Sequence, residues 1–261
     1  MSKRLKYLIS SIIASVGFYF FISLPYSSHY YGLLVGVVLI AFCFWFGLGI
    51  IFNQSLYIRL MSVILPIGFF IGFGLFAALL PQTFLTVFLS SLFFGMIAYV
   101  IFLVENVFLV SIGGRTPPLY RAAYTVGLML LLLMTFFLLD SLFSFKLIYW
   151  MNAIFILLIS AAVFMYLFYS VTIELSDDGK EKNLPAYVLV PAFLMAQLGL
   201  VLSFWPVGIF RGSIYLVAAV YIIASLIQLD LRERLFRKNQ LTFIWISIAV
   251  FLGMILTTSW H

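Results

Sequence analysis

The sequence has very little charge. Of its 261 residues, only 8% are Asp, Glu, Lys or Arg, whereas 66% are hydrophobic and the mean hydropathy is +1.24. A soluble domain carries about 25% charged residues, and so small a charged fraction could not cover its surface. This scarcity of charge excludes an ordinary soluble globular protein.

Cysteine and recognisable catalytic signatures are also scarce. Cys43 is the single cysteine and lies inside an apolar run, so no internal disulfide can form. The patterns H-E-x-x-H and G-x-S-x-G do not occur, and there is no Cys/His nucleophile pair. The two histidines, His29 and His261, lie at opposite ends of the chain without metal-ligand spacing. We therefore expect no metal, no cofactor and no common hydrolase chemistry.

The chain contains nine long apolar runs instead. Each is long enough to cross a hydrocarbon core of about 30 Å as a helix, and none shows the alternating, roughly ten-residue pattern of a membrane β-strand. The runs lie at residues 7–24, 30–52, 60–80, 84–104, 122–139, 148–171, 187–205, 213–229 and 241–260. They predict an all-α, polytopic transmembrane helix bundle that forms a single integral membrane domain over residues 1–261.

The first run could be confused with a secretory signal peptide, because it follows the basic segment MSKRLK. A cleavage site with small residues of the A-x-A type is missing near its end, where the chain reads FISLPYSSH. We therefore interpret the first run as an uncleaved helix.

The distribution of basic residues predicts the orientation. If the N-terminus is cytoplasmic, all but two of the 14 Lys and Arg residues fall on cytoplasmic segments, the exceptions being Lys146 and Arg211. This asymmetry follows the positive-inside rule and predicts a cell (cytoplasmic) membrane protein with its N-terminus in and its C-terminus out. The net charge of +6 then indicates contact with anionic lipid at the cytoplasmic face, and no nucleic-acid partner.

A shift of 125 residues suggests an internal repeat. It superimposes the third and fourth runs on the seventh and eighth, and matches Pro66 with Pro191, Gly74 with Gly199, Leu75 with Leu200, Pro81 with Pro206 and Glu105 with Asp230. The repeat units would be residues 1–121 and 122–240, with an added helix at 241–260. Four crossings per unit would make the units parallel. Such duplications occur in transporters, and also simply because a duplicated bundle packs well.

No acidic residue is expected near the bilayer centre. Glu105 and Asp230 fall at inner helix ends and Asp140 at an outer end, which argues against an ion-driven pump with a midplane carboxylate. The most central strong polar side chain is Gln197. It is a candidate intramembrane polar contact, either through a hydrogen bond to a neighbouring helix or through a substrate.

The stretch ENVFLVSIGGRTPPLYRAA, residues 105–123, is a polar interruption between the fourth and fifth apolar runs. Its glycines and prolines suit helix ends and lack the spacing of a phosphate-binding loop. We expect the fourth helix to extend beyond the membrane core, and the eighth to continue as a basic amphipathic segment. The candidate functional or partner surface therefore comprises Glu105, Arg115, Arg121, Asp230, Arg232 and Arg234. Alternatively, these residues only anchor the orientation and form interfacial ion pairs.

Three functions fit these features. The first is a non-catalytic scaffold or a subunit of a membrane complex, with a membrane-protein partner, because the loops are short and no central charge is present. The second is a small carrier for a neutral, apolar or lipid-like solute. The third is an interfacial enzyme acting on a lipid-linked substrate at the cytoplasmic face, which would require Glu105 and Asp230 to converge. An enzyme is the less favoured class.

Overall fold

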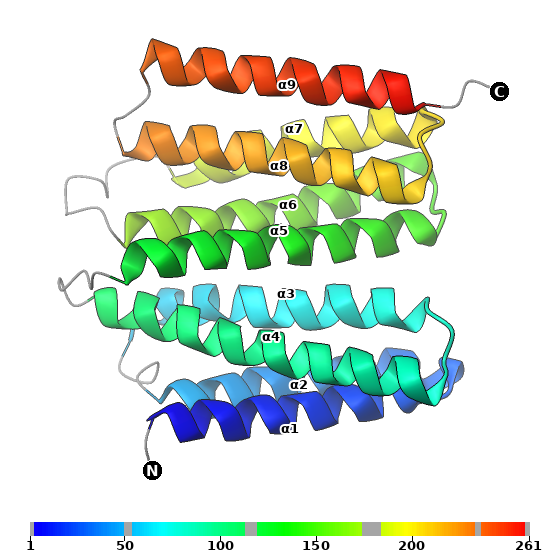
Figure 1. Cartoon of the computed structure of the whole chain (residues 1–261), viewed down its shortest axis with the longest axis vertical. Coiled ribbons are helices and arrows are strands. Elements are labelled where there is room, and N and C mark those ends of the chain that lie inside the picture. Colours follow the sequence, from blue (N-terminus) through cyan, green and yellow to red (C-terminus); the bar gives the residue numbers. More distant parts are fainter. Residues whose placement is uncertain (1–2, 50–53, 113–118, 174–183, 233–235, 259–261) are drawn as a thin grey trace. The chain divides into compact units, whose positions relative to one another are not determined.

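The computed structural model describes residues 3–49, 54–112, 119–173, 184–232 and 236–258, without the side chains of residues 3, 26 and 237–239. Within these ranges it contains nine α-helices, the 3-10 helix η1 (Tyr26–Ser28) and no strand (Figure 1). The helices are α1 (Lys3–Ser23), α2 (His29–Leu48), α3 (Leu56–Ala78), α4 (Phe84–Ser111), α5 (Tyr120–Ser144), α6 (Tyr149–Thr172), α7 (Leu184–Phe204), α8 (Ile209–Leu231) and α9 (Arg237–Thr257).

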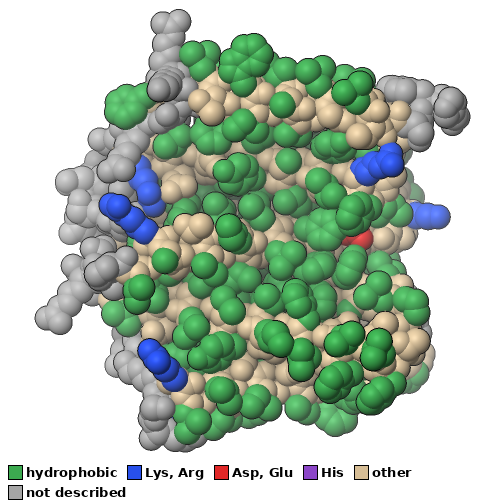
Figure 2. All heavy atoms as spheres, viewed as in Figure 1, with side chains coloured by type: hydrophobic (Ala, Val, Ile, Leu, Met, Phe, Trp, Pro, Cys, Tyr) green, Lys and Arg blue, Asp and Glu red, His purple; other side chains and the backbone are tan. Residues whose placement is uncertain are grey.

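All nine helices are long and apolar enough to cross a membrane. The sequence-based prediction of an all-helical, multi-pass membrane protein is therefore confirmed for the described residues. In Figure 2, hydrophobic side chains cover the sides of the helices, and the Lys and Arg side chains visible on this face lie at the helix ends. Such a surface suits lipid better than water.

The length of α4 agrees with the sequence-based prediction, whereas the boundary between α8 and α9 does not. Helix α4 has 28 residues, about 42 Å at 1.5 Å per residue, so it exceeds the hydrocarbon core as expected. Helix α8 ends at Leu231, and α9 begins at Arg237, four residues before the predicted start at 241. The bases at 237 and 238 thus open α9, and do not continue α8 as an amphipathic extension.

The chain forms two compact units, Met1–Leu138 and Leu139–His261. The boundary lies within α5, whereas the two predicted repeat units meet between residues 121 and 122. The most extensive helix contact also differs between the units, since α1 packs chiefly on α4 in unit 1 and α6 packs chiefly on α7 in unit 2. The 4+4+1 repeat therefore remains a prediction.

Small residues bring α1 and α4 together in unit 1. The Ser15 hydroxyl donates to the Ser91 carbonyl across the helix pair at 2.7 Å. One turn further along α4, a Cβ added at Gly95 would lie 2.8 Å from Ser15 Cβ. Such close backbone approach, sealed by an interhelical hydrogen bond, is how membrane helices associate where the hydrophobic effect is weak.

Stacked rings fill the core of unit 1. Phe18 of α1 is completely buried. Its ring lies 4.4 Å from that of Phe94 and 5.3 Å from that of Phe73, both nearly parallel to it. Phe70 meets the same ring edge-on at 5.9 Å. Aromatic pairs at such distances add about 0.5–1.5 kcal/mol each to the burial of their surface.

The core of unit 2 is built around the α6–α7 pair and is mainly aliphatic. A Cβ added at Gly199 of α7 would lie 2.2 Å from Cδ1 of Ile156 on α6, so a larger residue here would force the isoleucine side chain to move. Val163 and Ala192 on the facing helices are fully buried. Helix α8 packs on both α6 and α7, and α9 packs on α8.

Helix α9 is the least embedded element of unit 2. Only 6% of its apolar window is buried. Polar bonds near its C-terminal end attach it: Trp205 Nε1 donates to Thr258 Oγ1 at 2.8 Å, and the Arg211 guanidinium donates to the Thr257 carbonyl at 2.6 Å. Lipid contact is therefore the natural environment of most of α9.

Candidate functional site

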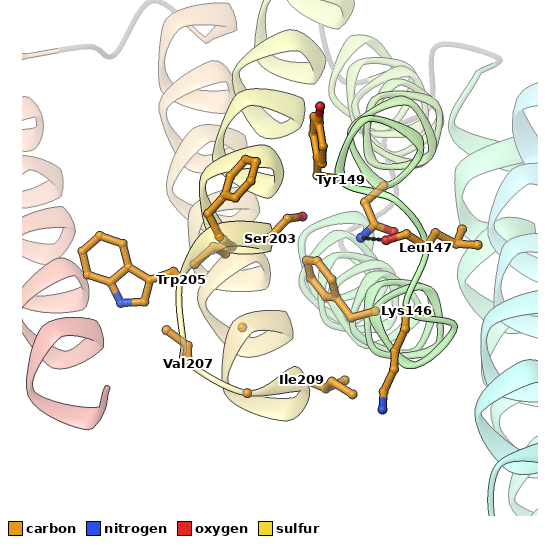
Figure 3. Close-up of a pocket in the computed structure, with 13 residues that line it drawn as sticks. Lys146, Leu147, Tyr149, Ser203, Trp205, Val207 and Ile209 are labelled. Carbon is orange, nitrogen blue, oxygen red and sulfur yellow. Dashed lines mark hydrogen bonds between the residues drawn. The ribbon is translucent and has the colours of Figure 1, made fainter. Parts of the chain in front are cut away.

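A cavity of about 380 Å³ opens at one end of unit 2. Its wall comes from the end of α5, the first turns of α6 and α8, the last turn of α7, and the α5–α6 and α7–α8 connections. The lining residues are Phe143, Lys146, Leu147, Tyr149, Asn152, Leu202, Ser203, Phe204, Trp205, Val207, Gly208, Ile209 and Gly212. Figure 3 shows how the side chains of Tyr149, Ser203 and Ile209 are arranged around it. Its volume is within the usual range of ligand pockets, about 300–1,000 Å³.

Four helix ends meet at this cavity. Helices α5 and α7 end here, and α6 and α8 begin here with Ile148 and Gly208 at their N-cap positions. Neither N-cap residue supplies a side-chain hydrogen bond, and the φ of +82° at Gly208 is one that glycine adopts without strain. The first-turn N–H groups of both helices have no intrahelical acceptor, so this end of the wall favours an anion.

A buried amide lines the same cavity. Asn152 is 5% exposed. Its Nδ2 donates to the Leu147 carbonyl at 3.4 Å, the bond drawn in Figure 3. Its Oδ1 is buried and accepts no hydrogen bond. A ligand with an N–H or O–H donor would satisfy that oxygen, whose isolation otherwise costs about 1–3 kcal/mol.

A buried carboxyl lies close to the wall. Asp140 on α5 is 7% exposed, and its Oδ1 accepts no hydrogen bond. The carboxyl lies near Ser213, whose hydroxyl donates to the Ile209 carbonyl at 3.0 Å. Ser213 directly follows Gly212, which lines the cavity. Asp140 thus places an acidic group next to the α8 side of the cavity.

Two basic residues lie at this end of unit 2, and their environments differ. Arg211 donates to the Thr257 carbonyl at 2.6 Å and is committed to α9. Lys146 is exposed, has a φ of 50°, and makes no ion pair with any described residue. Figure 3 shows its side chain extending away from Tyr149 and Ser203. Lys146 therefore offers a mobile positive charge at the mouth.

Gly212 lies beside empty space in the wall of the cavity. It is buried, yet a Cβ added there would meet no atom within 4 Å. Most other glycines of the helices are tightly packed; Gly199, for example, would meet Ile156. Gly212 therefore borders the empty volume and can be enlarged without a clash.

A second candidate surface lies on α7, away from the cavity. Gln197 is exposed, and its side chain forms no hydrogen bond within the described part of the chain. It lies three residues from the middle of α7, about 4.5 Å along the axis. The bond from Gln197 to a neighbouring helix that the sequence suggested is thus not among the described contacts, and Gln197 does not line the cavity.

Gln197 belongs to an exposed stripe with heptad spacing. The stripe alternates steps of three and four residues and comprises Val190, Phe193, Gln197, Leu200 and Phe204, all exposed. We call these five residues the α7 seam. Such a 3–4 spacing is the pattern by which one helix packs along another, and a single polar residue in it fixes the register.

The acids predicted to pair, Glu105 and Asp230, belong to different units. Glu105 on α4 is fully buried in the chain, and the next residue, Asn106, accepts a hydrogen bond from the Tyr7 hydroxyl at 2.8 Å. Asp230 on α8 is partly buried and accepts a hydrogen bond from the Tyr187 hydroxyl of α7. Each acid is thus placed within its own unit, and their convergence stays a prediction.

The arginines of the predicted surface have different positions. Arg121 is exposed in the first turn of α5. Arg232 is the C-cap residue of α8 and is partly buried. Arg115 and Arg234 lie outside the described residues.

Sequence reasoning missed the cavity. From the sequence alone, Asn152 lies near a predicted helix end, where water could satisfy its amide, and Gly212 has no distinguishing context. One signal was available: Lys146 and Arg211 are the only bases that depart from the predicted positive-inside pattern, and both lie at the cavity end.

Among the described residues, no three His, Cys, Asp or Glu side chains come together as a metal site. Comparisons with protein-family models, curated proteins and solved structures found no match.

Proposed function

We propose that this protein is a non-catalytic membrane scaffold that associates with a second copy of itself through the α7 seam. The observation that carries this proposal is the exposed amide of Gln197 in the middle of an apolar stripe. An amide that faces hydrocarbon without a hydrogen-bond partner costs several kcal/mol. Burial against a second helix that offers a hydrogen-bond partner removes that cost. Lipid acyl chains cannot remove it, because they have no hydrogen-bonding groups.

The partner follows from the chemistry of the amide. A glutamine side chain both donates and accepts hydrogen bonds, so two copies of it satisfy each other. Two copies in one membrane share an orientation, so a two-fold axis along the membrane normal places α7 beside α7 in parallel. Gln197 then faces Gln197 of the second copy, flanked by Phe193 and Leu200.

The test is the substitution Gln197→Leu, followed by Förster transfer between two fluorescently labelled populations in liposomes. Loss of interhelical hydrogen bonds worth about 0.6–2 kcal/mol weakens the dimer roughly 3- to 30-fold. The substitution breaks no described hydrogen bond, lies at an exposed position and replaces an amide with an apolar side chain of similar size, so we expect the monomer to fold normally.

Two matched variants sharpen the result. Gln197→Asn keeps an amide and should retain association. Leu189→Ala alters an exposed residue of α7 next to the seam and should change nothing. Transfer that is equal in wild type and Gln197→Leu, or absent in the wild type at any protein density, contradicts the proposal.

The orientation belongs to the same proposal. We place the N-terminus in the cytoplasm and the C-terminus outside the cell membrane, with the basic segments against anionic lipid, because all but two of the 14 Lys and Arg residues then lie inside. In a Cys43→Ala background, an impermeant thiol reagent applied to intact cells should label a cysteine at position 29 and none at 115 or 180. Labelling at 115 overturns this orientation.

The two other functions receive less support. A carrier that uses Gln197 as a substrate contact would need the amide to face a cavity, and Gln197 does not line the cavity of unit 2. An interfacial enzyme would need Glu105 and Asp230 in one pocket, but the Asp230 carboxylate is engaged by Tyr187 within unit 2. The parallel repeat is supported only by the matched prolines, glycines and acids of the sequence.

A further inference from the structure

The cavity of unit 2 has a polar wall of mixed sign and an apolar side, and it lies at the ends of membrane-spanning helices. We propose that it binds the headgroup of a zwitterionic phospholipid that carries a primary amine. The inference does not depend on self-association, because the α7 seam and the cavity share only Phe204.

The phosphate end is defined by α6 and α8. Both helices begin at the cavity without a side-chain cap, so their first-turn N–H groups and their dipoles favour a negative charge. Lys146 at the mouth makes no ion pair with the described residues, and its long side chain can reach a phosphate at the surface. Two helix N-termini thus lie at the place where a phosphate diester would sit, with an exposed lysine at the edge of the cavity.

The amine end is defined by oxygens. Asn152 Oδ1 is buried without a hydrogen bond, and Asn152 lines the cavity. Oδ1 of Asp140 is likewise without one, and this carboxyl lies near Ser213, just outside the residues that line the cavity. The C-terminal ends of α5 and α7 add further negative dipole ends. These groups favour a ligand that is positively charged and donates hydrogen bonds. A primary ammonium does both, whereas a quaternary ammonium has the charge but no N–H group.

The apolar side accommodates the rest of the lipid. Tyr149 and Phe204 both line the cavity, with ring centroids 5.1 Å apart, and both are exposed beyond it. Trp205 also lines it and is tied to α9 through Thr258. Tyrosine and tryptophan favour the depth of lipid headgroups, where one edge of the ring is wet and the other apolar. Acyl chains can leave the headgroup along this side.

The experiment is competition between two lipids that differ only in the amine. Purified protein in detergent is mixed with equal amounts of phosphatidylethanolamine and phosphatidylcholine of identical chains, and bound lipid is counted by native mass spectrometry. We expect phosphatidylethanolamine to be preferred about 2- to 10-fold, the effect of one hydrogen bond. Equal occupancy of the two lipids overturns the proposal.

Three substitutions locate the binding. Gly212→Val places a branched side chain in the open space of the cavity and should weaken the preferential adduct, whereas the matched Gly253→Val on α9 should leave it unchanged. Asn152→Leu should remove the preference for phosphatidylethanolamine but keep binding of both lipids. Lys146→Asn should weaken both lipids equally, because asparagine tolerates a positive φ and lacks the charge. Unaltered adducts in Gly212→Val, with an unchanged melting temperature, contradict the assignment of the cavity.

The source of the headgroup is tested separately. Soluble glycerophosphoethanolamine, which has the headgroup without acyl chains, should compete only at much higher concentration than the lipid. Competition at equal concentration would identify a water-soluble ligand and overturn the lipid. A stronger adduct with phosphatidylglycerol, which lacks the amine, would overturn the role given to Asn152 and Asp140.

Discussion

Unit 1 and unit 2 fill their interiors in different ways. Unit 1 stacks the ring of Phe18 against those of Phe73 and Phe94, and one apolar pocket in it holds only about 10 Å³, at most the size of one water molecule. Unit 2 packs aliphatic side chains between α6 and α7, and it ends in a cavity of about 380 Å³ bordered by buried polar groups. The two pockets described in these units thus differ widely in size and polarity.

Both units contain polar groups that join helices. In unit 1, Ser15 bonds to the Ser91 carbonyl and Tyr7 bonds to Asn106; in unit 2, Trp205 bonds to Thr258. Both also bury oxygens without a hydrogen bond, at Ser10 in unit 1 and at Asp140, Asn152 and Ser160 in unit 2. Buried oxygens of this kind destabilise a fold unless something else uses them. Of these residues, Asn152 lines the cavity of unit 2.

The largest expected effect is in the ring stack of unit 1. Phe18→Ala removes a fully buried ring and should lower the free energy of unfolding by about 3–5 kcal/mol. The matched variant Phe20→Ala lies on the same helix at 65% exposure and should cost much less. Unfolding in mixed micelles titrated with SDS, followed by circular dichroism, measures both. Equal losses would show that the stack is not the core.

Gly95 in the α1–α4 contact and Gly212 in the wall of the cavity allow tight packing and open space to be compared. Gly95→Ala brings a Cβ to 2.8 Å from that of Ser15, and overpacking of this kind costs about 1–3 kcal/mol. Gly212→Ala meets no atom within 4 Å, so it should be neutral or should gain up to about 1 kcal/mol in helix propensity. The same SDS titration compares the two variants. A loss at Gly212 as large as that at Gly95 would contradict an open cavity.

The smallest expected effect is in two serines. Ser15→Ala removes an interhelical hydrogen bond and should cost about 0.6 kcal/mol, at most about 1.7. Ser160→Ala removes a buried hydroxyl oxygen that has no hydrogen bond, and should be neutral or stabilising. The difference in SDS midpoint between the two variants is the measurement. A greater loss from Ser160→Ala would reverse the contrast between the units.

Much of the helical architecture could be predicted because hydrocarbon imposes simple demands. Backbone polar groups must be satisfied within a helix, so an apolar run of sufficient length predicts a span. The long α4 was expected from residues 84–112, and it runs to Ser111. The start of α9 at Arg237 was not predicted, because bases at a helix end can lie in water while the backbone is already helical.

The candidate sites were harder to predict for a physical reason. On a uniformly apolar helix such as α7, nothing in the spacing distinguishes the face that packs on α6 from the face that meets lipid. Gln197 was noticed as a polar residue, but its exposure depends on which side of α7 meets α6. Asn152 and Gly212 likewise acquire meaning only because the ends of four helices meet around them.

The sequence by itself determined the class of the protein, because the solvent that covers it can be inferred from composition and from the length of its apolar runs. Tertiary structure alone decided the rest. It placed Gln197 on an exposed seam, separated Glu105 and Asp230 into two units, and left open space beside Gly212 and Asn152. The physical reason is that hydropathy reports how much surface leaves water, whereas contact between particular side chains depends on which helix faces meet.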